Sequence, residues 1–282
     1  LQEMNREKYL GGIGMISNNV AEFVNKSEIL SVIGDRDINL KFIKDNLNNK
    51  TKFNYINKKN SPTITKRRFI DHIDKKKLLG VYDINDENFD RNQEKDFISL
   101  FRKLISKFDT LIVVDYGHGI INNTTSKLIS NSKIFTAINT QINSFNIGFQ
   151  KIDKYKKPDL LIINESELRH DLRDNSSNVD SLVSKIQSTI NFKKLVITRG
   201  SKGCFLYSKK QSNIKKIFCP AFATRIVDKV GSGDAMLSMM SVCLSAGLSD
   251  ELSLLIGSLA AAKSVENIGN SYSLKKVDLL KS

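Results

Sequence analysis

The feature that most constrains the fold is an apolar run that recurs four times and ends each time in polar or glycine residues. Runs of this length are typical of strands buried on both faces, and each is followed by a helical or loop segment. This alternation predicts an α/β fold with a mainly parallel central sheet and helices on both faces. An earlier strand at 28–34, with a helix across 36–47, continues the pattern. The four runs lie at 110–119, 133–141, 159–167 and 194–203.

Polar residues and glycines gather where these predicted strands end. In an open parallel sheet, ligands bind outside the carboxyl ends of the strands. A sequence that only built a core would have no need to repeat such residues there, so we expect this edge of the sheet to hold a ligand. The residues are Asp115, Asn139, Asn164, Glu167, Thr198 and Gly200.

Residues 61–86 break the alternation of strands and helices. Two β-rich runs flank the polar stretch DHIDKKK at 71–77, which predicts a hairpin outside the main sheet. A hairpin that projects over the strand ends would act as a lid on the ligand site. We therefore predict a single domain, residues 1–282, with a small β-sheet lid contributed mainly by about residues 51–86.

The composition is ordinary for a soluble globular protein, with 282 residues, 40% hydrophobic and 26% charged. No run of about 18 apolar residues predicts a transmembrane helix, and the first residues contain no apolar signal core. Three cysteines without metal-binding spacing indicate reduced thiols. We therefore expect a cytoplasmic protein with no membrane partner. The cysteines are Cys204, Cys219 and Cys243, the last within an apolar helical run that predicts a core position.

The net charge of +14 has two interpretations. It suits a polyanionic partner, either nucleic acid or a phosphorylated substrate, and it also suits a general drift of composition. The basic residues are scattered, and no nucleic-acid-binding motif is present. We therefore expect no nucleic-acid partner.

The stretch GSGD, residues 231–234, opens a run of small and apolar residues that predicts a buried helix. Gly231 and Gly233 permit backbone conformations that a side chain forbids, and they leave amide N–H groups exposed at the helix start. Such amides attract phosphate. Asp234 would then lie where it can take a proton from a hydroxyl beside that anion. The simpler interpretation is a glycine turn with a capping aspartate, and GSGD alone favours it.

Together with its neighbours, this stretch resembles the ribokinase-like (PfkB) carbohydrate kinases. DKVGSGDAM, residues 228–236, is similar to their Asp-Thr-x-Gly-Ala-Gly-Asp motif, with Lys229 and Ser232 in place of Thr and Ala. The resemblance implies a ribokinase-like fold, ATP and Mg²⁺ as cofactors, Asp234 as catalytic base, and Gly231, Ser232 and Gly233 as the anion hole. Three more motifs occur in the family order: NESE (164–167), VITRGSKGCFLY (196–207) and AAAKSVENIGN (260–270).

The resemblance also assigns roles on the nucleotide side. It implies that Glu167 places Mg²⁺ through water. Each motif has a plain structural interpretation as well: a helix cap for NESE, a hairpin turn for the glycines after residue 198, and a helix end with its C-cap for 260–270. The residues implied to bind ATP are Asn164, Thr198, Gly200, Gly203 and Asn267.

The closer resemblance is to heptose-phosphate kinases, so the implied substrate is a sugar or sugar phosphate. DYGHG, residues 115–119, is similar to their Asp-Tyr-Gly-Lys-Gly loop, with His118 at the lysine that would contact phosphate. As a general base His118 competes with a simpler interpretation, a surface loop side chain. GGIGMISNN, residues 11–19, is similar to Gly-Gly-x-x-Asn, with Met15 at the sugar-binding Asn. The strand that precedes this motif in the family is missing from this sequence.

Six residues are implied to bind the acceptor. Arg67 and Arg68, in the predicted lid, are bidentate donors suited to a phosphate, and an exposed strand face explains them equally well. The six are Gly11, Gly12, Asn19, Arg68, Asp115 and Asn139.

Two other functions stay open. Met15 and the missing strand favour a non-catalytic sugar-nucleotide-binding module of a larger nucleotidyltransferase fusion, whereas the GSGD and NESE motifs favour an enzyme. The net charge alone motivates a nucleic-acid binder. By the same resemblance, a homodimer that pairs through the lids and a fused nucleotidyltransferase domain upstream are expected partners.

Overall fold

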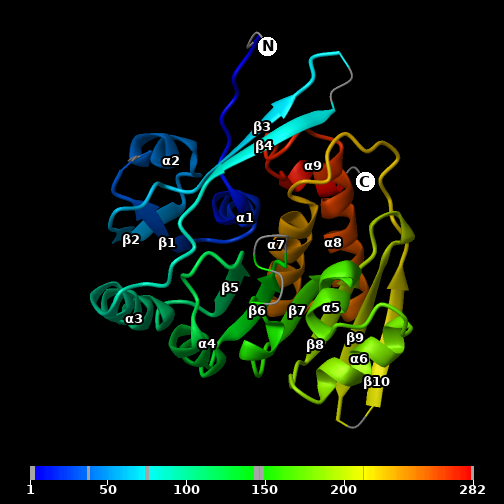
Figure 1. Cartoon of the computed structure of the whole chain (residues 1–282). Coiled ribbons are helices and arrows are strands. Elements are labelled where there is room, and N and C mark those ends of the chain that lie inside the picture. Colours follow the sequence, from blue (N-terminus) through cyan, green and yellow to red (C-terminus); the bar gives the residue numbers. More distant parts are fainter. Residues whose placement is uncertain are drawn as a thin grey trace.

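The protein is described from a computed structural model that covers residues 4–36, 39–73, 76–142, 146, 149–211 and 213–280. Six strands form its main sheet: β5 (Thr110–Asp115), β6 (Phe135–Thr140), β7 (Leu160–Asn164), β8 (Lys194–Thr198), β9 (Cys204–Lys210) and β10 (Asn213–Cys219). They lie in the order β10-β9-β8-β7-β6-β5 (Figure 1). β5 to β8 are parallel, and β9 and β10 add antiparallel at one edge. Each predicted apolar run is one of the parallel strands, so the predicted sheet is confirmed.

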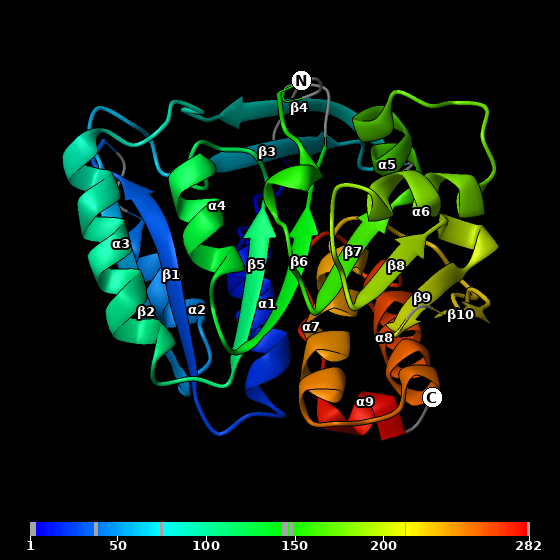
Figure 2. The same ribbon diagram turned by 90° about the horizontal axis from the view of Figure 1, so that it is seen from below.

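Helices cover both faces of this sheet (Figure 2), because alternate residues of a strand point to opposite sides. Leu161, Ile163 and Ile197 face one side and are fully buried. They belong to a core shared with α3 (Arg91–Ile105), α4 (Asn123–Ser130), α5 (Glu165–Leu172) and α6 (Val179–Gln187). Leu160 and Val196 face the other side, in a core shared with α1 (Gly12–Ala21), α7 (Ser232–Ser245) and α8 (Asp250–Val265). Each fully buried aliphatic side chain contributes about 1.5–3 kcal/mol.

Two more strands, β1 (Ser27–Gly34) and β2 (Thr51–Lys58), form a separate parallel pair joined through α2 (Leu40–Asn46). Among the described residues, β1 pairs only with β2, and β5 pairs only with β6. Both free edges line one cavity of about 2810 Å³, and Figure 2 shows no strand between them. The family resemblance predicts a strand ahead of residues 11–19, and within the described ranges no strand occupies this space.

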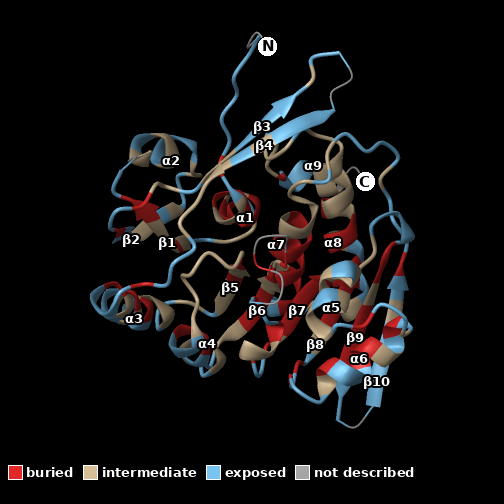
Figure 3. Cartoon of the chain, viewed as in Figure 1, coloured by how far each residue is buried: buried red, intermediate tan, exposed pale blue. Residues whose placement is uncertain are grey.

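The predicted hairpin is present as β3 (Thr65–Ile70) and β4 (Lys77–Asp83), which pair antiparallel as a two-stranded sheet of their own. Figure 3 shows that this hairpin is largely exposed, unlike the buried strands of the main sheet. The prediction placed residues from about 51 in the lid, and this boundary is corrected. β2 pairs parallel with β1, with Thr51 opposite Ser27, so residues 51–58 do not belong to the hairpin that is predicted to form the lid.

Short elements complete the chain. They are the 3-10 turns η1 (Ile152–Lys154) and η2 (Gly200–Lys202) and the C-terminal helix α9 (Lys276–Leu280). Within the described residues, no helix has the length and apolar character needed to cross a bilayer. Cys243 is buried in α7 as predicted, and Cys204 and Cys219 are buried as free thiols.

Candidate active site

The GSGD stretch forms the start of α7. Gly231 is the N-cap in the left-handed region, at φ +87°, and a Cβ there would lie 2.8 Å from Asn270 Oδ1. Glycine is therefore required at this position. No side chain among the described residues caps the helix, and its first amides have no carbonyl one turn earlier. The amides of Ser232, Gly233 and Asp234 thus provide a donor site for an anion at the positive end of a 14-residue helix.

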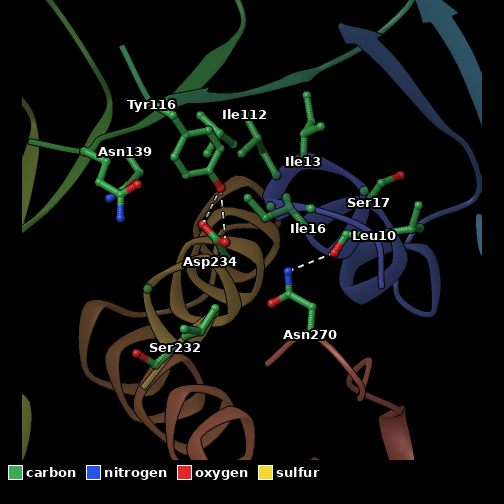
Figure 4. Close-up of a pocket in the computed structure, with 18 of the residues that line it drawn as sticks. Leu10, Ile13, Ile16, Ser17, Ile112, Tyr116, Asn139, Ser232, Asp234 and Asn270 are labelled. Atoms are coloured by element: carbon green, nitrogen blue, oxygen red, sulfur yellow. Dashed lines mark hydrogen bonds between the residues drawn. The ribbon is translucent and has the colours of Figure 1, made fainter. Parts of the chain in front are cut away.

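Asp234 lies in the first turn of α7 and is half-buried beside Tyr116 (Figure 4). The Tyr116 hydroxyl donates to both carboxylate oxygens, at 3.0 Å and 3.1 Å. Burial raises the pKa of Asp234 to about 6, against the lowering effects of this hydrogen bond and of the Lys66 charge. Burial and the neighbouring carboxylate raise the pKa of Tyr116 well above its usual value, so its hydroxyl keeps its proton and donates. A carboxylate of this kind is mostly ionised at pH 7 and can accept a hydroxyl proton.

Gly12 makes the close approach of Tyr116 to Asp234 possible. A Cβ at Gly12 would lie 1.6 Å from the Tyr116 hydroxyl oxygen and 3.0 Å from Asp234 Oδ2. The predicted substrate residues Gly11 and Gly12 both line the cavity, at the start of α1. Asn270 fixes the approach to this helix, because its Nδ2 donates to the Leu10 carbonyl at 2.9 Å (Figure 4).

Asp228 ties the GSGD turn to the loop after α8. One of its oxygens accepts from the Val230 amide at 3.1 Å, and the other accepts from the Gly269 amide at 2.9 Å. This residue stands at the first position of the family motif, but no local pattern assigns it a positioning role. Its partner Gly269 is 41 residues away, so only the fold reveals the contact.

The NESE motif forms a capping box at the start of α5. Asn164 accepts from the Ser166 amide, and Glu167 accepts from the Asn164 amide at 3.1 Å. Asn164 Nδ2 also donates to Thr198 Oγ1 at 3.2 Å, which joins the ends of β7 and β8. Asn164, Glu167 and Thr198 all line the cavity. The hydrogen bonds therefore confirm the capping interpretation. The same side chains also lie at the edge of the sheet where the sequence predicts a ligand.

Glu167 was predicted to place Mg²⁺ through water. Burial raises its pKa to about 7, against the hydrogen bonds that it accepts from the Asn164 and Ile142 amides. The described residues contain no group of three His, Cys, Asp or Glu that could cage a metal ion. Mg²⁺ is usually held by substrate phosphates, water and one or two carboxylates. The residues fit that arrangement, with Glu167 as the carboxylate that would contact the ion through water.

The glycine turn after β8 also borders the cavity. Gly200 and Gly203 both have positive φ, and a Cβ at Gly203 would meet the Cys219 carbonyl oxygen at 2.3 Å. Asn267, predicted to bind ATP, does not line the cavity. Its Nδ2 donates to the Lys263 carbonyl at 3.0 Å, because it caps the end of α8. The cavity is lined by the residues that follow it, Ile268 to Asn270.

The side chains of Asp115 and Asn19 both accept hydrogen bonds from other residues of the protein. Asp115 is 3% exposed and accepts from Tyr155 at 2.7 Å and Gln150 at 2.6 Å, so it anchors the loop that carries Tyr116. Asn19 lies outside the lining of the large cavity, because it follows Met15 by one helical turn on the far side of α1. Its Oδ1 accepts from the Leu274 amide at 2.9 Å. Asn19 therefore does not belong to the acceptor site, whereas Asp115 lines the cavity and its predicted role stays a prediction.

Other acceptor residues lie on the cavity. Asn139 lines it and donates to the Ile162 carbonyl at 3.0 Å. Arg68 lines it from the exposed lid strand. Lys66, which the sequence did not single out, is the more buried lid cation, and its Nζ lies 5.5 Å from the centre of the Tyr116 ring. His118 is not a surface side chain as the simpler interpretation held, because only 9% of it is exposed.

Comparisons with known proteins agree with this geometry. Residues 2–277 match the family described as pfkB family carbohydrate kinase. The chain is 27% identical, over 99% of its length, to the bifunctional protein HldE of Campylobacter fetus, of which it covers 59%. It is 22% identical, over 93% of its length, to the HldE of a Nitratiruptor species, of which it covers 54%. The chain thus spans somewhat more than half the length of these relatives.

Solved structures show the same fold at low identity. A ribokinase from Thermotoga maritima superposes with a TM-score of 0.73 at 19% identity, covering 96% of this chain and 86% of that chain. Phosphofructokinase-2 from Escherichia coli gives 0.75 at 13% identity, with the same two coverages. The predicted ribokinase-like architecture is confirmed. With the family match over almost its whole length, the chain belongs to the pfkB family of carbohydrate kinases, phosphotransferases whose acceptor is an alcohol group.

Proposed function

We propose that this protein transfers the γ-phosphoryl group of ATP, in the presence of Mg²⁺, to a hydroxyl of a sugar phosphate of the heptose-phosphate type. The observation that carries the proposal is the Tyr116–Asp234 contact at the start of α7. A hydroxyl already donates to the half-buried carboxylate beside the free amides of the helix. A sugar hydroxyl in the same position would have its proton accepted and would face an anion held by those amides.

Each part of the site then has a chemical task. Gly231, Ser232 and Gly233 supply backbone amides, which stabilise the charge of the transferred group. Asp234 orients the acceptor hydroxyl and takes its proton. The glycine turn at 200–203 and Thr198 border the space for the nucleotide. Mg²⁺, when bound with ATP, neutralises phosphate charge.

The acceptor class follows from charge and from the relatives. The lid places Lys66 and Arg68 on the cavity, and two cations there suit a phosphorylated acceptor. The similarity to two HldE proteins, together with the resemblance of the sequence motifs to heptose-phosphate kinases, supports a heptose-phosphate acceptor. A fused nucleotidyltransferase domain stays a prediction. So does a homodimer, which the exposed Phe69 and Leu79 of the lid support.

The test is ADP release from ATP and Mg²⁺ over a panel of hexoses, heptoses and their phosphates, with a no-acceptor control. We expect turnover with at least one phosphorylated sugar, well above the rate without acceptor. Nucleotide binding with no turnover on any acceptor would overturn the kinase assignment and favour the non-catalytic binding module.

A further inference from the structure

Two of the three cysteines lie directly opposite each other on neighbouring strands. Cys204 begins β9 and Cys219 ends β10, and the antiparallel register pairs these two residues. Directly opposite residues of such a pair have Cα atoms about 4.5–5.5 Å apart, and a disulfide spans Cα separations of about 4.4–6.8 Å. The backbone therefore already holds both residues within bridging distance, although both are free thiols in this structure.

The two thiols of this pair differ in acidity. The hydrogen bond between them lowers the pKa of Cys219 and raises the pKa of Cys204, which keeps its proton. Cys204 Sγ also lies 3.4 Å from the hydroxyl oxygen of Ser258 in α8. A thiolate beside a protonated thiol is the arrangement in which an oxidised sulfur is resolved to a disulfide. Cys243 contrasts with this pair, because burial raises its pKa.

The pair lies beside the glycine turn that borders the cavity. Gly203, Cys204 and Pro220 all line the cavity, so a reagent of the size of water can approach the pair from there. Gly203 packs closely against the opposite strand, since a Cβ at Gly203 would lie 2.3 Å from the Cys219 carbonyl oxygen and 3.0 Å from Pro220 Cα. A change in the spacing of the two cysteines is therefore transmitted to the turn and to the cavity wall.

We propose that Cys204 and Cys219 form a reversible redox site, in which hydrogen peroxide oxidises the two thiols to a disulfide and thereby weakens ATP binding. The bridge goes beyond the proposed function, and only its effect on ATP rests on that function. In the first step the Cys219 thiolate attacks the peroxide. An S–O bond forms, the O–O bond breaks, and the leaving hydroxide takes a proton from solvent to become water.

The second step closes the bridge. The Cys204 sulfur attacks the Cys219 sulfur of the sulfenic acid, so that an S–S bond forms and the S–O bond breaks. The leaving hydroxide takes the Cys204 proton and departs as a second water. The two thiols lose two electrons and the peroxide gains both, so the products are one disulfide and two waters.

The bridge would change the geometry at the edge of the cavity. Directly opposite side chains have Cβ atoms about 4.5–5.5 Å apart, whereas a disulfide holds them about 3.5–4.5 Å apart. Bridging therefore draws the ends of β9 and β10 together by about 1 Å, where Gly203 already meets the Cys219 carbonyl oxygen. It also removes the thiol that Cys204 places beside Ser258. Reduction restores both contacts, so the effect is reversible.

The first test detects the bridge by mass and needs no turnover. The protein is treated with a small excess of hydrogen peroxide, unfolded, alkylated without reductant, digested and analysed by mass spectrometry. We expect a cross-linked peptide pair that contains Cys204 and Cys219 and is lost with dithiothreitol, while Cys243 stays free for alkylation. Cys243→Ala should bridge like the native protein, and Cys204→Ala should gain one oxygen atom instead. If Cys204 and Cys219 remain alkylatable, or if Cys243 is oxidised equally fast, the redox site is overturned even in an active kinase.

The second test measures the effect on the nucleotide. ATP affinity is determined by calorimetry for the reduced protein, for the bridged protein and for the bridged protein after reduction. We expect the bridge to weaken ATP binding about fivefold or more, equivalent to about 1 kcal/mol, and reductant to restore it. Peroxide-treated Cys204→Ala, which cannot bridge, should bind ATP within about twofold of the untreated variant.

Two outcomes of this second test would contradict the proposal in different ways. Equal ATP affinity in the reduced and the bridged native protein would refute the effect of the bridge on the nucleotide. A reduced protein that does not bind ATP would overturn the proposed function and this effect together, whereas the mass measurement decides on the bridge by itself.

Discussion

The contact between Tyr116 and Asp234 predicts how the pH dependence of activity changes when the Tyr116 hydroxyl group is removed. Tyr116→Phe keeps the half-buried ring but removes the hydroxyl that donates to both oxygens of Asp234. A hydrogen bond to a charged group contributes about 1.5–3 kcal/mol, and one pKa unit corresponds to about 1.4 kcal/mol. The lost bond stabilised the ionised form, so the Asp234 pKa should rise from about 6 by about 1–2 units.

The assay is kcat/KM for the acceptor as a function of pH, because this ratio reports the ionisation of the free enzyme. Asp234 acts as a base only when ionised, so activity should rise with pH through about 6 in the native protein. In Tyr116→Phe that rise should move to about pH 7–8. The variant should therefore be roughly tenfold slower near pH 6 and nearly equal to the native protein at high pH.

A matched control exists in Tyr155→Phe. Tyr155 is a buried tyrosine, and its hydroxyl donates to Asp115 at 2.7 Å. Removing it should lower the free energy of unfolding by about 1–3 kcal/mol and leave the pH profile near its native position. A Tyr116→Phe profile that does not move, or one that moves equally in Tyr155→Phe, would refute the assignment of the acid limb to Asp234.

Two further predictions follow from the packing around the site. Gly12→Ala places a Cβ 1.6 Å from the Tyr116 hydroxyl oxygen, so the tyrosine must move. We expect the pH profile to shift in the same direction as in Tyr116→Phe, and the free energy of unfolding in urea to fall by about 1–3 kcal/mol. An unchanged profile would contradict this contact. The free edges of β1 and β5 predict faster amide exchange in these strands than in β7, which is paired on both sides. Hydrogen–deuterium exchange measured by mass spectrometry checks this. Equal protection of β1 and β7 would show that the space between β1 and β5 is closed in solution.

The sheet could be predicted from the sequence because buried parallel strands leave a strong local pattern. Each of the runs that became β5 to β8 is a short apolar segment with a polar or glycine end, and burial on both faces requires that composition. β2 was harder to place. Its residues are as suited to a lid hairpin as to pairing with β1, and only the register with Ser27–Gly34 decides between them.

The candidate site was predictable where a role belongs to the backbone. GSGD requires positive φ and free amides, and both are properties of the local sequence. Side-chain roles depended on long-range packing. Asp115 accepts a hydrogen bond from Tyr155, 40 residues away, and Asn19 accepts one from the amide of Leu274, 255 residues away. No local sequence pattern predicts either partner. Lys66 was missed for the same reason, since only the fold brings its ammonium group near the Tyr116 ring.

The central claim is that Asp234 is the catalytic base. It is tested most directly by measuring both the turnover and the ATP affinity of the Asp234→Asn variant. Asparagine has the same shape and can still accept from Tyr116, but it cannot take a proton from a hydroxyl. We expect ATP affinity within about threefold of the native protein and a loss of about 10²–10⁴-fold in kcat with the best acceptor. Turnover within about tenfold of the native rate, with ATP binding intact, would contradict Asp234 as the base.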